Sequence, residues 1–281
     1  MAAREENITR AAELLHVTQP TLSRQIAQLE EELGVKLFQR SNHHIILTDD
    51  GMLLKRRAQE LVSLAEKTKR DFSHRGEISG VVSIGSGELK SMQFLSEAIA
   101  SFREKYPGVT FEIYSGDSDD IKERIDRGLL DIGLLLEPVD ISKYDFVRTN
   151  ITEEWHALVS THSPLAEKAV LTPADFENVP LIFTRRELAQ AHIFSWLGKY
   201  ANENNIAASG NLLHNIAILA RNGVGCVISI RLDPQYEGLK YIPLSPKLES
   251  GTVLVWKKMQ PFPRATETFI EHLKEMLKQH F

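Results

Sequence analysis

The first third of the chain alternates apolar and polar positions at helical spacing. Apolar residues recur at intervals of four, three and four: Leu22, Ile26, Leu29 and Leu33. This stripe predicts a helix that starts with Pro20 in its first turn and ends at Gly34. A shorter amphipathic segment, residues 9–15, precedes it, and residues 38–48 resemble a short two-stranded ribbon. The pattern therefore predicts two helices joined by a tight turn, followed by a ribbon.

A second periodic segment starts at Asp49. Its apolar positions follow spacings of four, three, four, three and four: Leu54, Ala58, Leu61, Ala65, Thr68 and Phe72. These spacings form the a/d pattern of a coiled-coil seam, and the other faces are charged. We favour a dimerising helix over a single helix lying on its own domain, because the outer faces are too charged to bury. A hinge is expected at residues 76–80.

Beyond residue 79 strands alternate with helices. The first group comprises strands at 81–84, 109–114 and 131–136, with helices at 92–106 and 118–127. The second comprises strands at 155–160, 181–184, 226–230, 239–243 and 252–257, a helical turn at 173–176, helices at 191–204 and 215–222, and a final helix at 265–278. The first group is a β-α-β-α-β series, which predicts a mostly parallel sheet. We expect an α/β fold with two lobes and a cleft between them.

Composition narrows the class of protein. The length of 281 residues fits about two domains. The net charge of −5 divides into +1 for residues 1–75 and −6 for residues 76–281, so the whole chain is not a general polyanion binder. A single cysteine, Cys226, excludes an intrachain disulfide framework and a Cys-rich zinc site. No apolar run is long enough to span a membrane and no secretory signal is visible, so a cytoplasmic location is expected.

Polar side chains are concentrated at the start of the second predicted helix. A recognition helix needs this arrangement, because its first turns face base edges and phosphates while the apolar stripe packs on the domain. The predicted DNA-contacting residues are Thr18, Gln19, Pro20, Thr21, Ser23 and Arg24. The ribbon tip, with Arg40, His43 and His44, could touch the backbone or minor groove. The alternative is a pair of amphipathic helices in an ordinary small α domain.

The motifs match a known family at many positions. They are Ala11-Ala12, Gln19-Pro20-x-Leu22-Ser23-x-Gln25-Ile26, Leu33-Gly34-x-x-Leu37-Phe38-x-Arg40 and Leu47-Thr48-x-x-Gly51. Residues 7–57 thereby resemble the winged helix-turn-helix of LysR-type transcriptional regulators. The later motifs Phe102-x-x-x-Tyr106-Pro107-x-Val109, Gly128-x-Leu130-Asp131-Ile132-Gly133 and Asn222-Gly223-x-Gly225 resemble the family's effector domain, which is similar to type 2 periplasmic binding proteins. The resemblance covers essentially the whole chain.

The resemblance implies a regulator of double-stranded promoter DNA, controlled by a small effector and assembled as a homodimer or homotetramer. The expected domains are a winged helix-turn-helix at 1–58, a linker and dimerisation helix at 59–78, and an effector domain at 79–281. Lobe I would hold residues 79–150 and 260–281, and lobe II residues 151–259. No membrane partner and no cofactor are expected. No enzyme motif is present, and His43-His44 lacks the acidic or thiol partner that a metal site would need.

One departure from the family concerns the N-terminus. Family members carry a further apolar helix before the segment that matches residues 5–9, whereas this sequence begins at Met1. The first helix is therefore expected to be truncated, which would remove a packing partner from Ala11, Leu15, Leu22 and Ile26. We favour a misplaced start codon. The alternative is a small-molecule-binding module that has lost DNA binding.

The effector site is expected where strands end. Gly85-Ser86-Gly87 closes the first strand of the second region, and ligands of open α/β sheets bind at such carboxyl ends. Lys90 breaks the dinucleotide-binding Gly-x-Gly-x-x-Gly pattern. By resemblance, the first lobe contributes Ser86, Gly87, Glu88, Ser91, Gly116 and Asp117, and the second contributes Thr184, Arg185, Arg186, Val224 and Gly225. The two arginines would select an anionic ligand, unless they are solvated loop charges.

Overall fold

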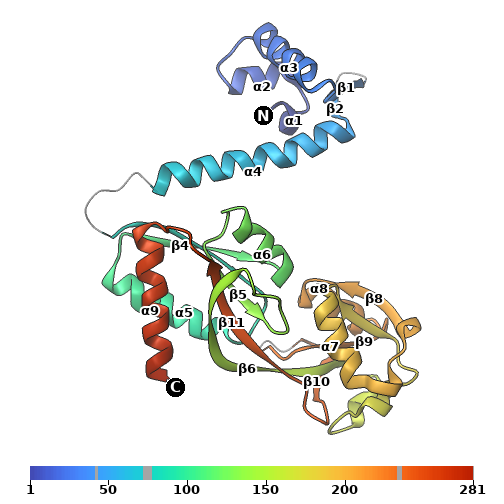
Figure 1. Cartoon of the computed structure of the whole chain (residues 1–281). Helices are drawn as coiled ribbons and strands as arrows, with labels where there is room; N and C mark the ends of the chain where they lie inside the picture. Colours follow the sequence, from blue (N-terminus) through green and yellow to red (C-terminus); the bar gives the residue numbers. More distant parts are fainter. Residues whose placement is uncertain (42–43, 72–77, 233–235, 281) are drawn as a thin grey trace. The chain divides into compact units, whose positions relative to one another are not determined.

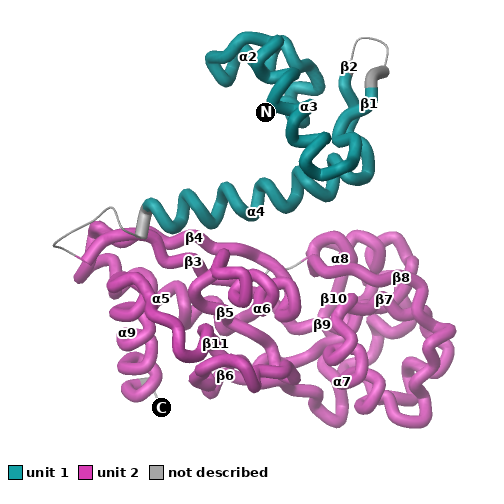
Figure 2. The backbone as a smooth tube through the Cα atoms, turned by 45° about the horizontal axis from the view of Figure 1, so that its top comes forward, with its two compact units in different colours: residues 1–69 teal, residues 70–281 magenta. Residues whose placement is uncertain are grey.

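The computed structural model describes residues 1–41, 44–71, 78–232 and 236–280. The chain divides into two compact units, residues 1–69 and 70–281 (Figure 2). The first unit contains α1 (Ala2–Glu5), α2 (Ile8–Leu14), α3 (Gln19–Leu33), β1 (Phe38–Ser41), β2 (His44–Leu47) and α4 (Asp49–Asp71) (Figure 1). The two predicted helices, the ribbon and the long helix are thus confirmed. Residues 76 and 77 of the expected hinge lie outside the described residues. Phe72 of the expected seam also lies outside them.

Local sequence signals set the ends of these helices. The Asn7 side chain accepts a hydrogen bond from the Arg10 amide at 3.0 Å and caps α2. Thr18 caps α3, and Gly34, with a φ of 69°, ends it in the left-handed conformation. A small core of Ala11, Ala12 and Leu22 lies between α2 and α3. The apolar stripe of α3 therefore packs as predicted at Leu22, while the polar residues of its first two turns are exposed or half-buried.

The second unit is built on one mixed sheet. Its strands are β3 (Gly80–Ser86), β4 (Val109–Ser115), β5 (Ile132–Leu136), β6 (Tyr144–Ser160), β7 (Leu181–Thr184), β8 (Ile206–Gly210), β9 (Cys226–Ile230), β10 (Leu239–Pro243) and β11 (Glu249–Lys257). Its helices are α5 (Met92–Lys105), α6 (Ser118–Asp126), α7 (Glu187–Leu197), α8 (Leu213–Arg221) and α9 (Arg264–His280), with 3-10 turns at Pro164–Glu167, Pro173–Phe176, Gly198–Tyr200 and Glu203–Asn205. The strand order is β4-β3-β5-β11-β6-β9-β7-β8, and β10 also pairs with β6.

Two lobes share this sheet. The first lobe has the parallel strands β4, β3 and β5, and the second has the parallel strands β8, β7 and β9. Antiparallel strands join the lobes: β11 pairs with β5 and β6, and the end of β6 pairs with β9 and β10. The expectation of a mostly parallel sheet thus holds within each lobe and not across the join. Helices lie on both faces of each strand group (Figure 1).

Alternating side chains divide each lobe into two apolar layers. In β7, Leu181 and Phe183 pack on the side of α7, whereas Ile182 packs against α8. In the first lobe, Phe102 of α5 lies 5.1 Å from Phe269 of α9, measured between ring centroids. The main core therefore runs through both lobes on one side of the sheet.

Two predicted elements differ from the structure. The helix expected at 191–204 is α7, which ends at Leu197 because Gly198 has a φ of 56°, and 3-10 turns follow it. The strand expected at 155–160 is the last part of β6, which starts at Tyr144. The first half of β6 carries charged residues at exposed positions, so it lacks the apolar run from which a strand was predicted at 155–160.

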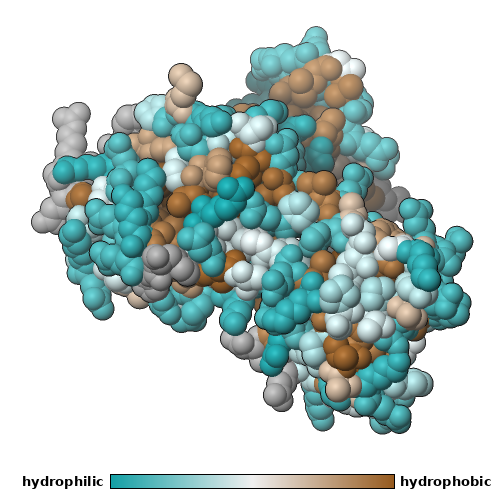
Figure 3. All heavy atoms as spheres, turned by 60° about the horizontal axis from the view of Figure 1, so that its bottom comes forward, coloured by the Kyte–Doolittle hydropathy of each residue, from teal (hydrophilic) through white to brown (hydrophobic). Residues whose placement is uncertain are grey.

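On the face shown in Figure 3, hydrophobic residues form patches within a largely hydrophilic surface. Among the described residues, no helix is both long enough and apolar enough to cross a membrane.

Candidate functional site

The start of α3 presents a continuous polar face. Thr18, Gln19, Pro20, Thr21 and Arg24 are exposed and Ser23 is half-buried. The Thr18 and Thr21 hydroxyl oxygens lie 2.8 Å apart, and the Gln19 amide donates to the Ser23 hydroxyl at 2.8 Å. The structure therefore brings together all six residues predicted on this helix.

The ribbon residues are placed only by their backbone. In β1 and β2, Arg40 pairs with Ile45, and Ser41 pairs with His44. His43 lies outside the described residues. The predicted roles of Arg40, His43 and His44 therefore stay predictions.

A cleft of about 120 Å³ lies between the two lobes of the second unit. The first lobe lines it after β3, β4 and β5, and the second lobe lines it after β7 and β8 and with the starts of α7 and α8. These are the carboxyl ends of parallel strands, where ligands of such sheets bind. The lining residues predicted from the sequence are Gly87, Glu88, Gly116, Asp117, Thr184 and Arg186.

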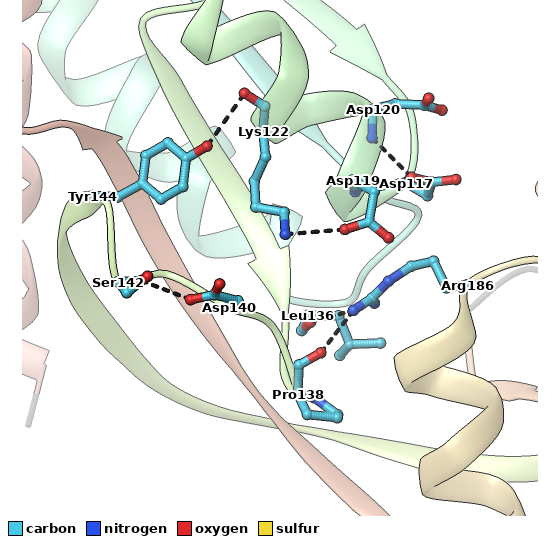
Figure 4. A network of polar contacts seen from close by, with 10 residues as sticks. All are labelled: Asp117, Asp119, Asp120, Lys122, Leu136, Pro138, Asp140, Ser142, Tyr144 and Arg186. Atoms are coloured by element: carbon cyan, nitrogen blue, oxygen red, sulfur yellow. Dashed lines mark hydrogen bonds and ion pairs between the residues drawn. The ribbon is translucent and has the colours of Figure 1, made fainter.

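Arg186 reaches from the second lobe to the first. Its side chain is 7% exposed, and its Nη2 donates to the Pro138 carbonyl at 2.8 Å and to the Leu136 carbonyl at 3.3 Å (Figure 4). Its Nε has no hydrogen-bond partner among the described residues. Burial lowers the pKa of the Arg186 guanidinium, and the charges of Asp119 and Asp117 act in the opposite direction. The cleft therefore contains a buried cation whose desolvation is only partly offset.

Carboxylates of the chain itself occupy three helix starts around the cleft. Glu153 accepts from the amides of Lys90 at 3.1 Å and Ser91 at 2.7 Å, just before α5. Asp117 caps α6 through two 3.0 Å bonds. Glu88 accepts from the Leu213 amide of α8 at 2.7 Å. No described side chain caps the start of α7, which directly follows Arg186.

Five predicted residues do not line the cleft. Ser86 and Ser91 are buried, and Arg185 is exposed outside the cleft lining. Val224 and Gly225 lie in the turn that leads from the end of α8 into β9. β9 runs parallel to β7, so this turn is at the amino ends of the strands, opposite the cleft. We therefore leave these five residues out of the proposed site.

Sequence reasoning also missed part of the cleft. Trp155, Leu136 and the segment 210–213 line it. The indole N–H of Trp155 donates to the Ser250 hydroxyl at 2.9 Å, which fixes the ring at the join of the lobes. The segment 210–213 follows β8, a strand that was not predicted. A prediction of β8 would have placed its carboxyl end at the cleft.

Metal-binding groups are also relevant to the site. Within the described ranges, no cluster of three or more His, Cys, Asp or Glu side chains could hold a metal ion. Cys226 is buried, and burial raises the pKa of its thiol to about 12. The thiol is therefore protonated at neutral pH and suits a packing role.

Comparisons with protein families match nearly the entire chain. The family described as "Bacterial regulatory helix-turn-helix protein, lysR family" matches residues 1–52, and the "LysR substrate binding domain" family matches residues 75–278. The HTH-type transcriptional regulator YtlI of Bacillus subtilis (strain 168) is 27% identical, over 96% of this chain and 89% of that protein. The HTH-type transcriptional regulator CysB of Burkholderia cenocepacia is 27% identical, over 97% and 90%.

Solved structures show the same fold. CbnR, a LysR family transcriptional regulator, superposes with a TM-score of 0.76 at 19% identity, covering 98% of this chain and 95% of that one. Full-length CbnR complexed with its target DNA gives a TM-score of 0.74 at 19% identity, covering 98% and 96%. The match to the helix-turn-helix family favours DNA binding over a binding module that has lost it. The chain belongs to the LysR family and is a DNA-binding transcriptional regulator with a substrate-binding domain.

Proposed function

We propose that the first turns of α3 enter the major groove and that a small effector with an anionic group, bound in the cleft, controls this binding. The protein would act in the cytoplasm and catalyse no reaction. The proposed domains are residues 1–58 for DNA reading, 59–78 for the linker and 79–281 for effector binding. The observation that carries the effector part is Arg186, a buried guanidinium in the cleft with an unpartnered Nε.

The exposed polar residues of α3 support the proposed DNA contact. Thr18, Thr21 and Ser23 offer hydroxyls, Gln19 an amide and Arg24 a cation, the groups that bind base edges and phosphates. Leu22 faces the core, so the helix keeps its orientation on the domain. The ribbon would place Arg40, His43 and His44 at the backbone or minor groove as a wing.

The long helix α4 supports assembly of two copies. Leu61 is 68% exposed and Val62 is 57% exposed, although they lie on a helix with seam spacing. A second copy would cover such residues and remove their apolar area from water. Two copies joined in this way would read a pseudo-palindromic site.

Arg186 would couple the effector to the shape of the second unit. The guanidinium joins the lobes through the carbonyls of Leu136 and Pro138. An anion at Nε and at the free amides of α7 would offset the desolvation of the guanidinium. Such a ligand changes DNA geometry only in so far as it binds one arrangement of the lobes more tightly than another.

Arg24→Ala tests the DNA contact. We expect weaker binding to DNA that flanks the gene, by about 1–3 kcal/mol if Arg24 reaches a base, or a salt slope lower by about 1 if it reaches a phosphate. A mobility-shift titration at several salt concentrations measures both quantities. Arg103→Ala is the matched control, because Arg103 is an exposed arginine on α5 of the other unit. Unchanged affinity and slope for Arg24→Ala, equal to those of the control, would contradict the proposed contact.

A further inference from the structure

The charged side chains of the cleft do not suit a ligand that is only an anion. Among the described residues, Glu88 and Asp117 line the cleft from the first lobe, and Arg186 lines it from the second. The lining therefore has two carboxylates for one guanidinium. A simple carboxylate would gain from Arg186 and be repelled by the two acids.

The places available to an anion are few. Glu153, Asp117 and Glu88 already occupy the amides at the starts of α5, α6 and α8. The start of α7 has no side-chain cap, and Arg186 stands directly before it. Arg186 is more than nine-tenths buried, and its Nε lacks an acceptor within the described part of the chain. An anionic group therefore fits at this one end of the cleft.

Glu88 provides an acceptor for a positively charged group. Its Oε2 accepts from the Leu213 amide, which leaves Oε1 without a hydrogen-bond partner among the described residues. An ammonium group would donate to Oε1 and cancel the excess negative charge of the lining. Glu88 thus differs from Glu153, whose two oxygens both accept backbone amides.

The remaining lining combines apolar side chains with the uncharged polar side chains of Ser115, Ser118, Thr184, Asn211 and Ser229. Trp155, Leu136, Ile216, Ile228 and Ile230 belong to the apolar part, and the volume of about 120 Å³ limits the ligand to a small molecule. The uncharged part of the ligand would therefore be a short hydrocarbon group.

We infer that the effector is a small zwitterion: Arg186 and the start of α7 bind its anionic group, Glu88 binds its ammonium group, and the apolar wall around Trp155 holds its body. This inference rests on the proposed function, because it assigns a ligand class to the same cleft. Glu88 is then the residue that distinguishes amino acids from simple carboxylic acids.

Calorimetric titration of the full chain with matched compounds tests the ligand class. The amino acids are leucine, phenylalanine and 4-aminobutyrate, and the acids without the ammonium group are 4-methylpentanoate, 3-phenylpropanoate and butanoate. We expect at least one amino acid to bind, and its matched acid to bind at least tenfold more weakly. Equal or tighter binding of the acids would overturn the zwitterion and leave the proposed effector cleft intact. Binding of neither class would count against both.

Glu88→Gln tests the residue assigned to the ammonium group. The amide oxygen can still accept from Leu213, so the link between the lobes is kept while the charge is lost. We expect the affinity for the bound amino acid to fall about tenfold and the affinity for its matched acid to stay the same or rise. Glu97→Gln, an exposed change on α5, is the control and should alter neither. An equal loss for both ligands in Glu88→Gln would show a structural role and contradict the assignment.

Discussion

The two units differ in how their candidate contact residues are placed along the chain. In the first unit they follow one another over residues 18–24 at the start of a single helix. In the second unit the cleft residues come from the strands β4 to β9, from the turn after β3 and from the starts of three helices, between Gly87 and Ile230. A helix fixes neighbouring residues by local geometry, whereas a cleft depends on how the whole sheet is ordered. The residues of the proposed DNA-reading face could therefore be predicted from the sequence, whereas those of the effector cleft could be predicted only in part.

The units also differ in what stabilises them. The fully buried apolar residues of the first unit are small, as at Ala11 and Ala12, and Leu29, Leu53 and Leu61 remain exposed. The second unit buries large side chains such as Phe102 and Phe269 completely. A small domain buries a smaller share of its surface, so polar contacts carry more of its stability. We therefore expect apolar substitutions to dominate in the second unit and polar ones to matter more in the first.

The largest effect is expected for Phe269→Ala in the second unit. The ring is fully buried, 5.1 Å from Phe102 and 4.8 Å from Phe111 between centroids, so its removal should cost about 3–5 kcal/mol. Tryptophan fluorescence during urea unfolding measures this unit alone, because Trp155, Trp196 and Trp256 all lie in it.

Phe146→Ala provides the control, since Phe146 is 46% exposed, and its cost should stay below about 1 kcal/mol. The part of the far-ultraviolet circular dichroism transition that does not coincide with the fluorescence transition reports the first unit, and it should not shift in either variant. If Phe269→Ala lowered the unfolding midpoint of both units equally, the division into separately stabilised units would be wrong.

A smaller effect is expected for Glu30→Ala in the first unit. The Glu30 carboxylate is 8% exposed and accepts from Lys36 Nζ at 2.6 Å, the Leu37 amide at 2.9 Å and the Phe38 amide at 3.3 Å. These bonds join the end of α3 to the start of the ribbon, and their loss should cost about 1.5–3 kcal/mol. Thermal unfolding followed by far-ultraviolet circular dichroism measures this loss of stability.

Glu31→Ala is the matched control, because the neighbouring Glu31 is exposed. It should leave the transition unchanged, and neither substitution should move the tryptophan transition of the second unit. Equal effects of the two changes would mean that the buried carboxylate contributes no more than a surface charge.

The burial of Glu30, in contrast to its neighbours, could not be predicted from the sequence. Glu30, Glu31 and Glu32 form one acidic run, and nothing in the run distinguishes the member that is buried. Burial arises because the chain turns back after Gly34 and brings the amides of Leu37 and Phe38 to Glu30. By contrast, Thr18, Pro20 and Gly34 set the ends of α3 through local chemistry, and these ends were predicted.

The cleft also depends on contacts that the sequence does not reveal, here between residues far apart in the chain. Glu88 and Leu213 lie 125 residues apart, yet they share a hydrogen bond across the lobes. Strand order decides this contact, and β8 and the first half of β6 were both missed in the sequence. Arg186 was predicted and lines the cleft, whereas its neighbour Arg185 does not, because successive side chains leave the end of β7 in different directions.

The smallest expected effect, the response to acid, separates the units again. In the second unit, burial lowers the pKa of His156 and of His272 below the ordinary value of 6.5. As the pH falls below 6.5, these histidines take up protons in the unfolded chain before they do so in the folded unit. The free energy of unfolding of the second unit therefore decreases as the pH falls below 6.5. In the first unit, the bond to Lys36 holds the pKa of Glu30 below 4.5. The stabilisation by the Glu30 carboxylate is fully present above pH 4.5. It is lost only as the pH falls through the pKa that Glu30 has in the folded protein.

Urea unfolding at pH 7, 6 and 5 checks this difference, with tryptophan fluorescence for the second unit and circular dichroism for the first. The fluorescence midpoint should fall over this range more than the midpoint of the first unit. His272→Gln should reduce the fall, because glutamine can keep a hydrogen bond to Ser101, which lies 2.8 Å from Nε2, without taking up a proton. An unchanged fall in His272→Gln would assign the effect to His156, and equal falls in both units would show that neither histidine causes it.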